Sequence, residues 1–222
     1  MVAAHSPGKL AAPRIRPVKL SHLADAEAEV LEDEENHEGL RWAGTSFADR
    51  SLRGLSFVGC EFDAVELADA DLTAARFSDC RLTRLNLPVL TAPDASWVGS
   101  EIVASRIGAW EGYGANLRAV RVDECKITYA NLRGAALTDV LFSHCTFDEL
   151  DLMDVSGLRV SFVDCSIGVL TAHRTNIGAF DLRGASIGAV SGMDGLKGAT
   201  ISADQVSLLA PQFAEHLGIN VD

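Results

Sequence analysis

Six histidines and five cysteines are the residues of this chain with the most scope for chemistry. The histidines are His5, His22, His37, His144, His173 and His216, and the cysteines are Cys60, Cys80, Cys125, Cys145 and Cys165. Only His144 and His173 fall within the repeats described below, and neither sits with a cysteine in a metal-ligand spacing such as the Cys-x-x-Cys that zinc sites use. The chain also shows no phosphate-binding loop, Gly-x-Ser-x-Gly motif or zinc-binding helix motif. We therefore expect no catalytic residues, no cofactor and no metal.

Carboxylates form two clusters, and paired carboxylates can act as general acid and base. The clusters are Glu61, Asp63, Glu66, Asp69 and Asp71, and then Asp148, Glu149, Asp151 and Asp154. Catalysis would also need a groove to hold a substrate, and the repeating pattern described next suggests none. We interpret both clusters as solvated corners and expect the protein not to be an enzyme.

A five-residue period determines where all of these side chains lie. From Trp42 to Ile187 every fifth residue is Leu, Ile, Val, Phe or Trp, except at the small residues Ala92, Gly112, Gly157 and Ala172. Neither a helix nor a straight strand repeats every five residues. A short period sustained over this length indicates a solenoid of stacked repeats.

Each five-residue repeat predicts one short edge and one corner. A small residue stands two places before the large one, with a polar residue between them, as in Ala70–Leu72 and Ala130–Leu132. This in–out–in alternation is typical of a short extended segment. The two residues after the large one are often Arg-Gly or Thr-Ala, which suit a bend.

The cysteine spacing indicates how many edges make one coil. All five cysteines occupy the small inward position, at intervals of 20, 45, 20 and 20 residues. Twenty residues are four repeats, so we predict four edges per coil and about seven coils, a rod of roughly 35 Å at a strand spacing of ~4.8 Å. The 45-residue interval holds one extra repeat, extruded at either Pro88–Asp94 or Gly108–Gly114. We favour the first, because proline donates no ladder hydrogen bond.

Inward cysteines in odd number point to reduced thiols and a cytoplasmic protein. We expect two stacks, Cys60 with Cys80, and Cys125 with Cys145 and Cys165. A disulfide between adjacent coils is the alternative, because stacked positions fall within the Cα separation that a disulfide spans.

Several repeats carry a recognisable motif. Ala70–Leu72 reads Ala-Asp-Leu, Ala115–Leu117 reads Ala-Asn-Leu, Ala130–Gly134 reads Ala-Asn-Leu-Arg-Gly and Asp181–Gly184 reads Asp-Leu-Arg-Gly. These segments resemble the pentapeptide-repeat protein family. The resemblance implies an all-β fold, a right-handed quadrilateral β-helix. Some bacterial members bind DNA gyrase or topoisomerase IV as DNA mimics and confer quinolone resistance or toxin immunity, whereas many have no assigned activity.

The solenoid residues that we expect to form the core share the large position of the repeat. They are Phe47, Leu52, Phe57, Phe62, Leu67, Leu72, Phe77, Leu82, Leu117, Leu132, Leu137, Phe142, Phe147, Leu152, Phe162, Ile167, Ile177, Leu182 and Ile187.

The chain divides into four parts. We predict a disordered tail over 1–17, an N-terminal cap or arm over 18–39, the β-helix over 40–189, and an irregular last turn with a C-terminal helix over 190–222. The N-terminal cap is either a short helix or an irregular arm that covers the first coil, because an open solenoid end exposes core and strand edge. After Ile187 the large positions Leu196 and Ile201 are one residue out of phase.

The C-terminal helix follows a capping-box motif, Ser202–Gln205. Val206, Leu209, Phe213 and Leu217 recur at helical spacing and predict a stripe that the last coil covers. Pro211 should kink or split the helix, and Gly218 should end it. Leu208 and Ile219 lie off the stripe and are the candidate interface of a two-fold homodimer.

The charge of the chain limits its partners. A net charge of −12 argues against nucleic acid as a direct ligand. No apolar run reaches the ~18 residues of a membrane span, and Met1–Leu20 does not read as a signal peptide. Residues 40–189 carry 19 acidic and 14 basic side chains, a net charge of −5, whereas a DNA duplex of the rod's length carries roughly 20 charges. We favour a non-catalytic protein-interaction module with an unidentified partner; the alternative is a DNA mimic that binds a type II topoisomerase.

Overall fold

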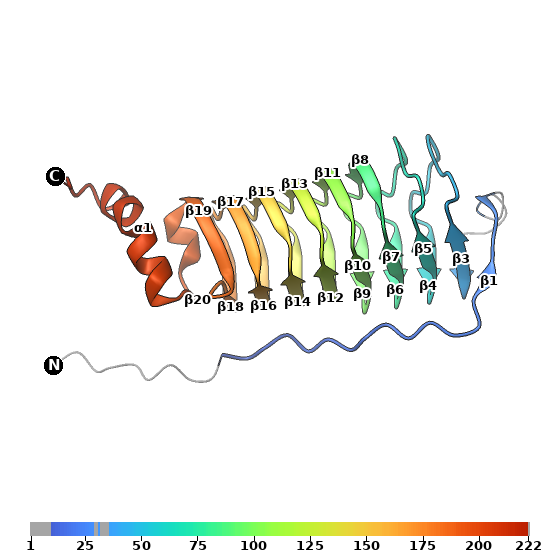
Figure 1. Cartoon of the computed structure of the whole chain (residues 1–222), viewed down its shortest axis with the longest axis horizontal. Helices are drawn as coiled ribbons and strands as arrows, with labels where there is room; N and C mark the ends of the chain where they lie inside the picture. Colours follow the sequence, from blue (N-terminus) through green and yellow to red (C-terminus); the bar gives the residue numbers. More distant parts are fainter. Residues whose placement is uncertain (1–9, 29–30, 32–35, 222) are drawn as a thin grey trace.

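The chain forms a parallel β-solenoid closed at one end by a helix (Figure 1). The computed structural model describes residues 10–28, 31 and 36–221. Strands of successive coils pair in parallel at an offset of 20 residues, as Arg81 does with Glu101 and Glu101 with Arg121. This offset confirms four repeats per coil. The coils number about nine rather than the expected seven, because pairing extends beyond 40–189 at both ends.

Two sheets make up the described part of the rod. The larger one contains β1 (Ala24–Asp25), β3 (Leu40–Ala43), β5 (Glu61–Asp63), β7 (Arg81–Thr83), β10 (Glu101–Val103), β12 (Asn116–Asp123), β14 (Ala136–Ser143), β16 (Ser156–Val163), β18 (Asn176–Asp181) and β20 (Ala199–Thr200), with β2 (Asn36–Glu38), β4 (Ser56–Val58), β6 (Arg76–Ser78) and β9 (Ser96–Val98) leading into β12. The smaller one contains β8 (Asn86–Thr91), β11 (Arg106–Glu111), β13 (Lys126–Asn131), β15 (Thr146–Asp151), β17 (Cys165–Thr171) and β19 (Ala185–Ser191).

No repeat is extruded at either expected place, so that prediction is wrong. β8 pairs with β11, and β11 with β13, both at the 20-residue offset. The Ala74 N–H also donates to the Pro93 carbonyl at 2.9 Å, so Pro88–Asp94 runs within a regular coil. Proline is tolerated because its neighbours Leu87 and Val89 carry the aligned pairing.

The inward cysteine position instead moves by one edge between Cys80 and Cys125, and serine fills it in between. The Cys80 thiol donates to the carbonyls of Phe57 and Ser78, at 3.3 and 3.4 Å. One coil later the buried Ser100 hydroxyl lies at 3.3 and 3.1 Å from the equivalent carbonyls. A serine can therefore replace a cysteine here because its hydroxyl reaches the same acceptors.

The core is a continuous stack of the large side chains. All of the core residues proposed above are buried except Ile177, which is half-buried near the C-terminal end of the rod. Rings from successive coils stack on one another, with centroids 5.1 Å apart for Phe57 and Phe77 and 4.1 Å for Phe77 and Trp97. The large positions therefore fill the solenoid interior, as the five-residue period predicts.

The N-terminal part is ordered along the rod where the structure describes it. The tail expected over 1–17 is not disordered from residue 10 onward, because its backbone is hydrogen-bonded to the solenoid at Arg14; residues 1–9 lie outside the described ones. Figure 1 shows this segment following the rod from the α1 end towards β1. In the following arm β1 pairs with β3, and Ala28 and Leu31, both in 3₁₀-helical conformation, pack onto the core.

The C-terminal part follows the expected change of phase. β18 pairs with β20 at an offset of 19 residues, after a short 3₁₀ helix, η2 (Met193–Leu196). The helix α1 (Ala203–His216) begins with the predicted capping box, and it is continuous through Pro211 rather than split. Gly218 has a φ of 71° and ends the helix, with its N–H donating to the Glu215 carbonyl.

Candidate interaction surface

Arginine–carboxylate pairs connect neighbouring coils along the surface of the rod. Residues 20 positions apart lie one coil apart, so a corner arginine meets a corner carboxylate on the next coil. The Nε atom of Arg159 is 2.5 Å from Asp139, and that of Arg174 is 2.6 Å from Asp154. The hydrogen bond from Arg159 holds the pKa of Asp139 below its usual range. A search of the sequence at a spacing of 20 would have found these pairs, which the analysis by five-residue repeats missed.

The same pairing neutralises much of the acidic clusters. Arg84 forms a bidentate contact with Asp63, and its hydrogen bond lowers the pKa of that carboxyl. Arg133 Nε lies 2.6 Å from Asp151. The paired arginines Arg84, Arg133 and Arg159 belong to different coils, so positive side chains recur along the rod. A long, purely acidic strip therefore does not form across these coils.

The histidines and cysteines do not come together as a site. His144 Nδ1 lies 3.0 Å from Asp123, and this contact raises the pKa of His144. The five cysteines are buried and free. The thiols of Cys125 and Cys165, together with burial, raise the pKa of Cys145, so this thiol stays protonated. Within the described residues, no group of three or more His, Cys, Asp or Glu side chains could hold a metal ion.

Two glutamines seat α1 on the last coil. The Gln205 Nε2 atom donates to the carbonyls of Leu182 and Ala185, at 2.7 and 2.6 Å. The Gln212 side chain accepts from the Val190 N–H at 2.8 Å and donates to the Gly188 carbonyl at 3.2 Å. These amides satisfy backbone groups that would otherwise be left open at the end of the solenoid.

The covered stripe of α1 differs from the predicted one. Leu209 is 1% exposed, whereas Val206 is 47% and Leu217 is 70% exposed, so the prediction that these two face the coil is wrong. The reason is that the helix turns Gln205, not Val206, towards the edge of the last coil. The backbone carbonyls at that edge need hydrogen-bond donors, which a glutamine supplies and a valine does not. Leu208 and Ile219, the proposed dimer residues, are 71% and 56% exposed.

Five of the eleven exposed large apolar side chains among the described residues lie at this end of the chain. They are Val206, Leu208, Leu217, Ile219 and Val221. The helix is too short and too polar to cross a membrane, and the described residues include no other helix long and apolar enough to do so.

This chain is similar to solved structures at low sequence identity. A search of curated proteins finds no match. The solved structure of full-length QnrB1, a plasmid-mediated fluoroquinolone resistance protein, is 22% identical, with 83% of this chain and 90% of that chain covered and a TM-score of 0.29. HetL, a pentapeptide-repeat protein involved in heterocyst differentiation regulation from the cyanobacterium Nostoc, is 14% identical, with 78% and 94% covered and a TM-score of 0.30.

A family model describes the repeats themselves. The model for pentapeptide repeats matches eight copies, over residues 43–87 and 115–154. Both stretches lie within the continuous 20-residue ladder of the solenoid. The chain therefore contains pentapeptide repeats over these two stretches of the solenoid.

Proposed function

We propose that this protein is a non-catalytic protein-interaction module whose C-terminal helix binds a second copy of the chain. The observation that carries this proposal is the apolar surface of α1 and the residues after it. Leu208, Leu217 and Val221 are 71%, 70% and 72% exposed. Isolated exposed apolar residues are ordinary, whereas several of them within one terminal segment favour an interaction site.

A two-fold contact suits this position. An isologous interface places the same patch of both subunits against itself, so one apolar segment is enough. The segment lies at one end of the rod (Figure 1), so the dimer would be two rods end to end. Nine coils at ~4.8 Å give roughly 43 Å for one rod and about twice that for the pair.

The absence of catalysis is supported by the chemistry of the surface. The thiols are buried and free, which suits a reducing compartment, and we propose a cytoplasmic location. The described carboxylates that are shifted in pKa are paired with arginine, threonine, serine or histidine side chains. Such pairs stabilise the rod without offering an unpaired acid or base in a pocket.

The family resemblance also suggests a more specific partner, a type II topoisomerase. DNA mimicry needs an extended run of negative charge, and the arginine pairs on Asp63, Asp139 and Asp151 interrupt it. We therefore rank it second. Inhibition of gyrase supercoiling by the purified protein, at concentrations at which it forms a stable complex with gyrase, would reverse that order.

Light scattering tests the proposed contact. We expect wild-type protein to have the mass of a dimer and Leu208→Glu to have the mass of a monomer, because a carboxylate at the centre of the interface would be desolvated. Tyr113→Glu is the matched control, since Tyr113 is 46% exposed but lies in the rod; it should remain dimeric. A monomeric wild type would remove the dimer, and a dimer unaffected by Leu208→Glu would place the interface elsewhere.

A further inference from the structure

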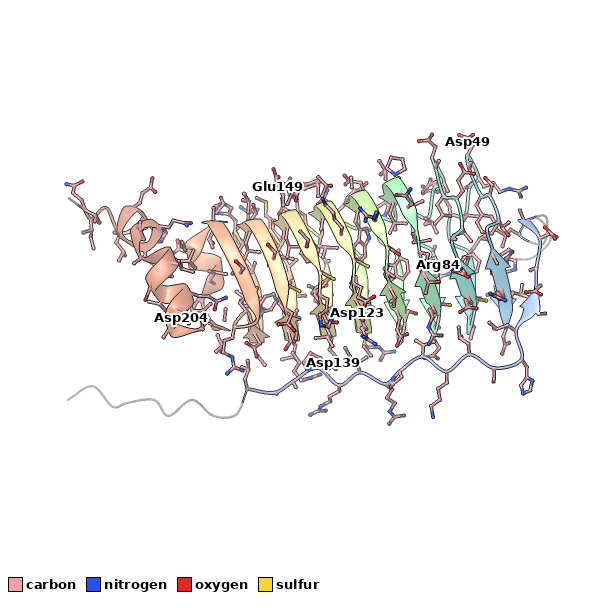
Figure 2. The ribbon with its side chains drawn as sticks, in the orientation of Figure 1. Asp49, Arg84, Asp123, Asp139, Glu149 and Asp204 are labelled. Atoms are coloured by element: carbon pink, nitrogen blue, oxygen red, sulfur yellow. The ribbon has the colours of Figure 1, made fainter. Side chains whose placement is uncertain are left out.

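Residues 10–19 form an extended segment along the rod, which we call the strap. The Arg14 N–H donates to Asp139 Oδ1 at 2.9 Å, and the Val18 N–H donates to Glu101 Oε1 at 3.1 Å. Figure 2 shows Asp139 on the side of the rod that the strap follows, with Asp49 and Glu149 on the opposite side in this view. Within the described residues, the hydrogen bonds between strap and rod use the backbone of the strap, and the charge of the Arg14 side chain adds an electrostatic interaction with Asp139.

Each contact point is an arginine–carboxylate pair that spans two neighbouring coils. Arg81 Nε donates to Glu101 Oε2 at 3.2 Å, and Arg81 Nη2 donates to the Val18 carbonyl at 2.9 Å. This pair therefore holds the N–H and the C=O of a single residue, as a neighbouring strand would. At the second point the Arg159 guanidinium donates to both oxygens of Asp139, at 2.5 and 2.7 Å, and Oδ1 also accepts from the strap.

Both pairs are formed by side chains of the rod alone. With the strap in place Glu101 is 5% and Asp139 is 8% exposed, and each is oriented by an arginine of the rod itself. Buried carboxylates are favourable only when their remaining lone pairs are also hydrogen-bonded. A backbone N–H from an extended segment supplies that bond, so the rod presents a preorganised groove for a peptide backbone.

The strap matches the groove in spacing and stiffness. Glu101 aligns with Arg121, and Arg121 with Leu141, so the two contact points lie about two coils apart, ~9.6 Å. Four residues of polyproline-like chain, from Arg14 to Val18, span ~12 Å. Pro13 and Pro17 directly precede the two docked residues, and proline restricts its own φ and the residue before it to extended conformations.

The strap covers the groove without filling it. Val18 is the one buried residue of the strap, and the basic side chains of Arg14, Arg16 and Lys19 are exposed. A cleft of about 760 Å³ remains between strap and rod. It is lined on the rod side by Asp79, Val98, Gly99, Arg118, Ala119 and Asp139. Recognition thus rests on backbone groups and one small aliphatic side chain, and there is room for larger side chains.

We propose that this face of the rod docks an extended, proline-containing segment of a protein partner, and that the strap occupies it in cis as an intramolecular competitor. This inference rests on the proposed interaction function and names a second surface that serves it. A basic segment is favoured because the protein carries a net charge of −12. Since the hydrogen bonds are to the backbone, a partner segment needs the spacing of the strap and a small aliphatic residue at the place of Val18, not the same sequence.

The test titrates a fluorescent peptide with the sequence of residues 10–20 against full-length protein and measures anisotropy. In wild type the tethered strap competes at an effective concentration on the order of millimolar, so the free peptide should bind weakly. Val18→Pro in the protein removes the N–H that reaches Glu101 and leaves the rod unchanged. We expect this variant to bind the peptide at least about tenfold more tightly. Lys19→Pro, which keeps the Val18 N–H, is the matched control and should behave as wild type.

A second peptide, N-methylated at the position of Val18, isolates the proposed hydrogen bond. It should bind the Val18→Pro protein at least about tenfold more weakly than the unmodified peptide. Equal binding of the two peptides, or binding of neither, would overturn the docking site. All measurements are repeated in the Leu208→Glu background, which separates this surface from the C-terminal contact. Self-association in that background that the free peptide reverses would identify a second copy as the occupant and overturn the assignment to a partner.

Discussion

At the scale of single residues, the corners of the coil carry a conformational cost. At most corners the second residue after the large position has a positive φ, and it is often not glycine: Ala64, Ala74, Ala104 and Ala119 have φ between 50° and 58°. An L-residue in this region is disfavoured by roughly 1–2 kcal/mol. The strands of the smaller sheet run through the equivalent position without this conformation, whereas at the other corners the chain turns through it and the stacked coils hold it in place.

Ala104→Gly should therefore stabilise the protein. Ala104 is exposed and has a φ of 50°, so glycine relieves the strain without removing a contact; we expect a gain of up to about 1 kcal/mol after the extra freedom of the unfolded glycine is counted. Ala43→Gly is the control, because Ala43 is an exposed residue of β3 and should lose about 0.5–1 kcal/mol. The readout is the midpoint of denaturant unfolding, and a loss at both positions would contradict the argument.

The sequence predicts which residues point inward but not how their sizes are balanced. The four small residues at large positions looked like interruptions. At Gly112 the interior is filled by Trp110, two residues earlier, and an added Cβ would lie 2.9 Å from the Trp110 Nε1 atom and 3.0 Å from Leu132 Cδ2. Ala92 and Ala172 likewise follow the buried Leu90 and Leu170. In these repeats the large residue stands at the position two residues earlier, and the small residue stands at the position that is usually large. A period read from the large position alone does not reveal this exchange.

At the scale of elements, the C-terminal cap shows what periodicity leaves out. The helix and both of its ends could be predicted, because capping boxes and terminal glycines have local causes. Its covered face could not, because that face is chosen by the exposed carbonyls of the last coil. The side-chain amides of Gln205 and Gln212 donate hydrogen bonds to those carbonyls. From the sequence alone, a glutamine beside an apolar stripe cannot be recognised as a capping residue, because the strand edge that it contacts is not visible there. The strap was missed for a similar reason, since its contacts are made by backbone groups.

Gln205→Ala should loosen this cap. The change removes the donor to the Ala185 carbonyl and one of two donors to the Leu182 carbonyl, which keeps the Ala185 N–H. An unmet buried acceptor costs about 1–3 kcal/mol. Because each coil contacts only its neighbours, we expect the loss to be local. Hydrogen exchange should therefore accelerate in β19 and β20 and stay unchanged in β5 and β7. Ser207→Ala, on the exposed side of α1, is the control; uniform acceleration along the rod would contradict a local role for the cap.

At the scale of the whole molecule, the five-residue period predicts the architecture and underestimates its length. The ladder of large residues stops at Ile187, whereas backbone pairing continues to β20 and begins as early as β1. These outer coils lack the apolar signal because their residues face an end of the rod and pack on arms or on α1. The coil count thus depends on hydrogen bonds that the terminal segments share with the rod, and these leave no periodic trace in the sequence.

The coils are also tied together by carboxylates, and this predicts how the whole rod responds to acid. Between neighbouring coils, hydrogen bonds from Arg84 and Arg159 lower the pKa values of Asp63 and Asp139. Within one coil, Arg183 lowers the pKa of Asp181, and the Thr73 hydroxyl lowers that of Asp71 to about 2. A carboxyl whose pKa is lower when folded stabilises the folded state above its unfolded pKa of ~3.9. This stabilisation disappears as the pH falls through the folded pKa.

The melting temperature should therefore change little between about pH 6 and 5, then fall steadily from about pH 4 to 2. Asp139→Asn should lower the melting temperature at pH 6 and flatten the decline, because its contribution is already absent. Asp49→Asn is the matched control; Asp49 is an exposed corner aspartate, so its decline should follow that of the wild type. A melting temperature that is constant down to pH 2, or one that falls already above pH 5, would show that these inter-coil pairs do not contribute to the stability of the rod.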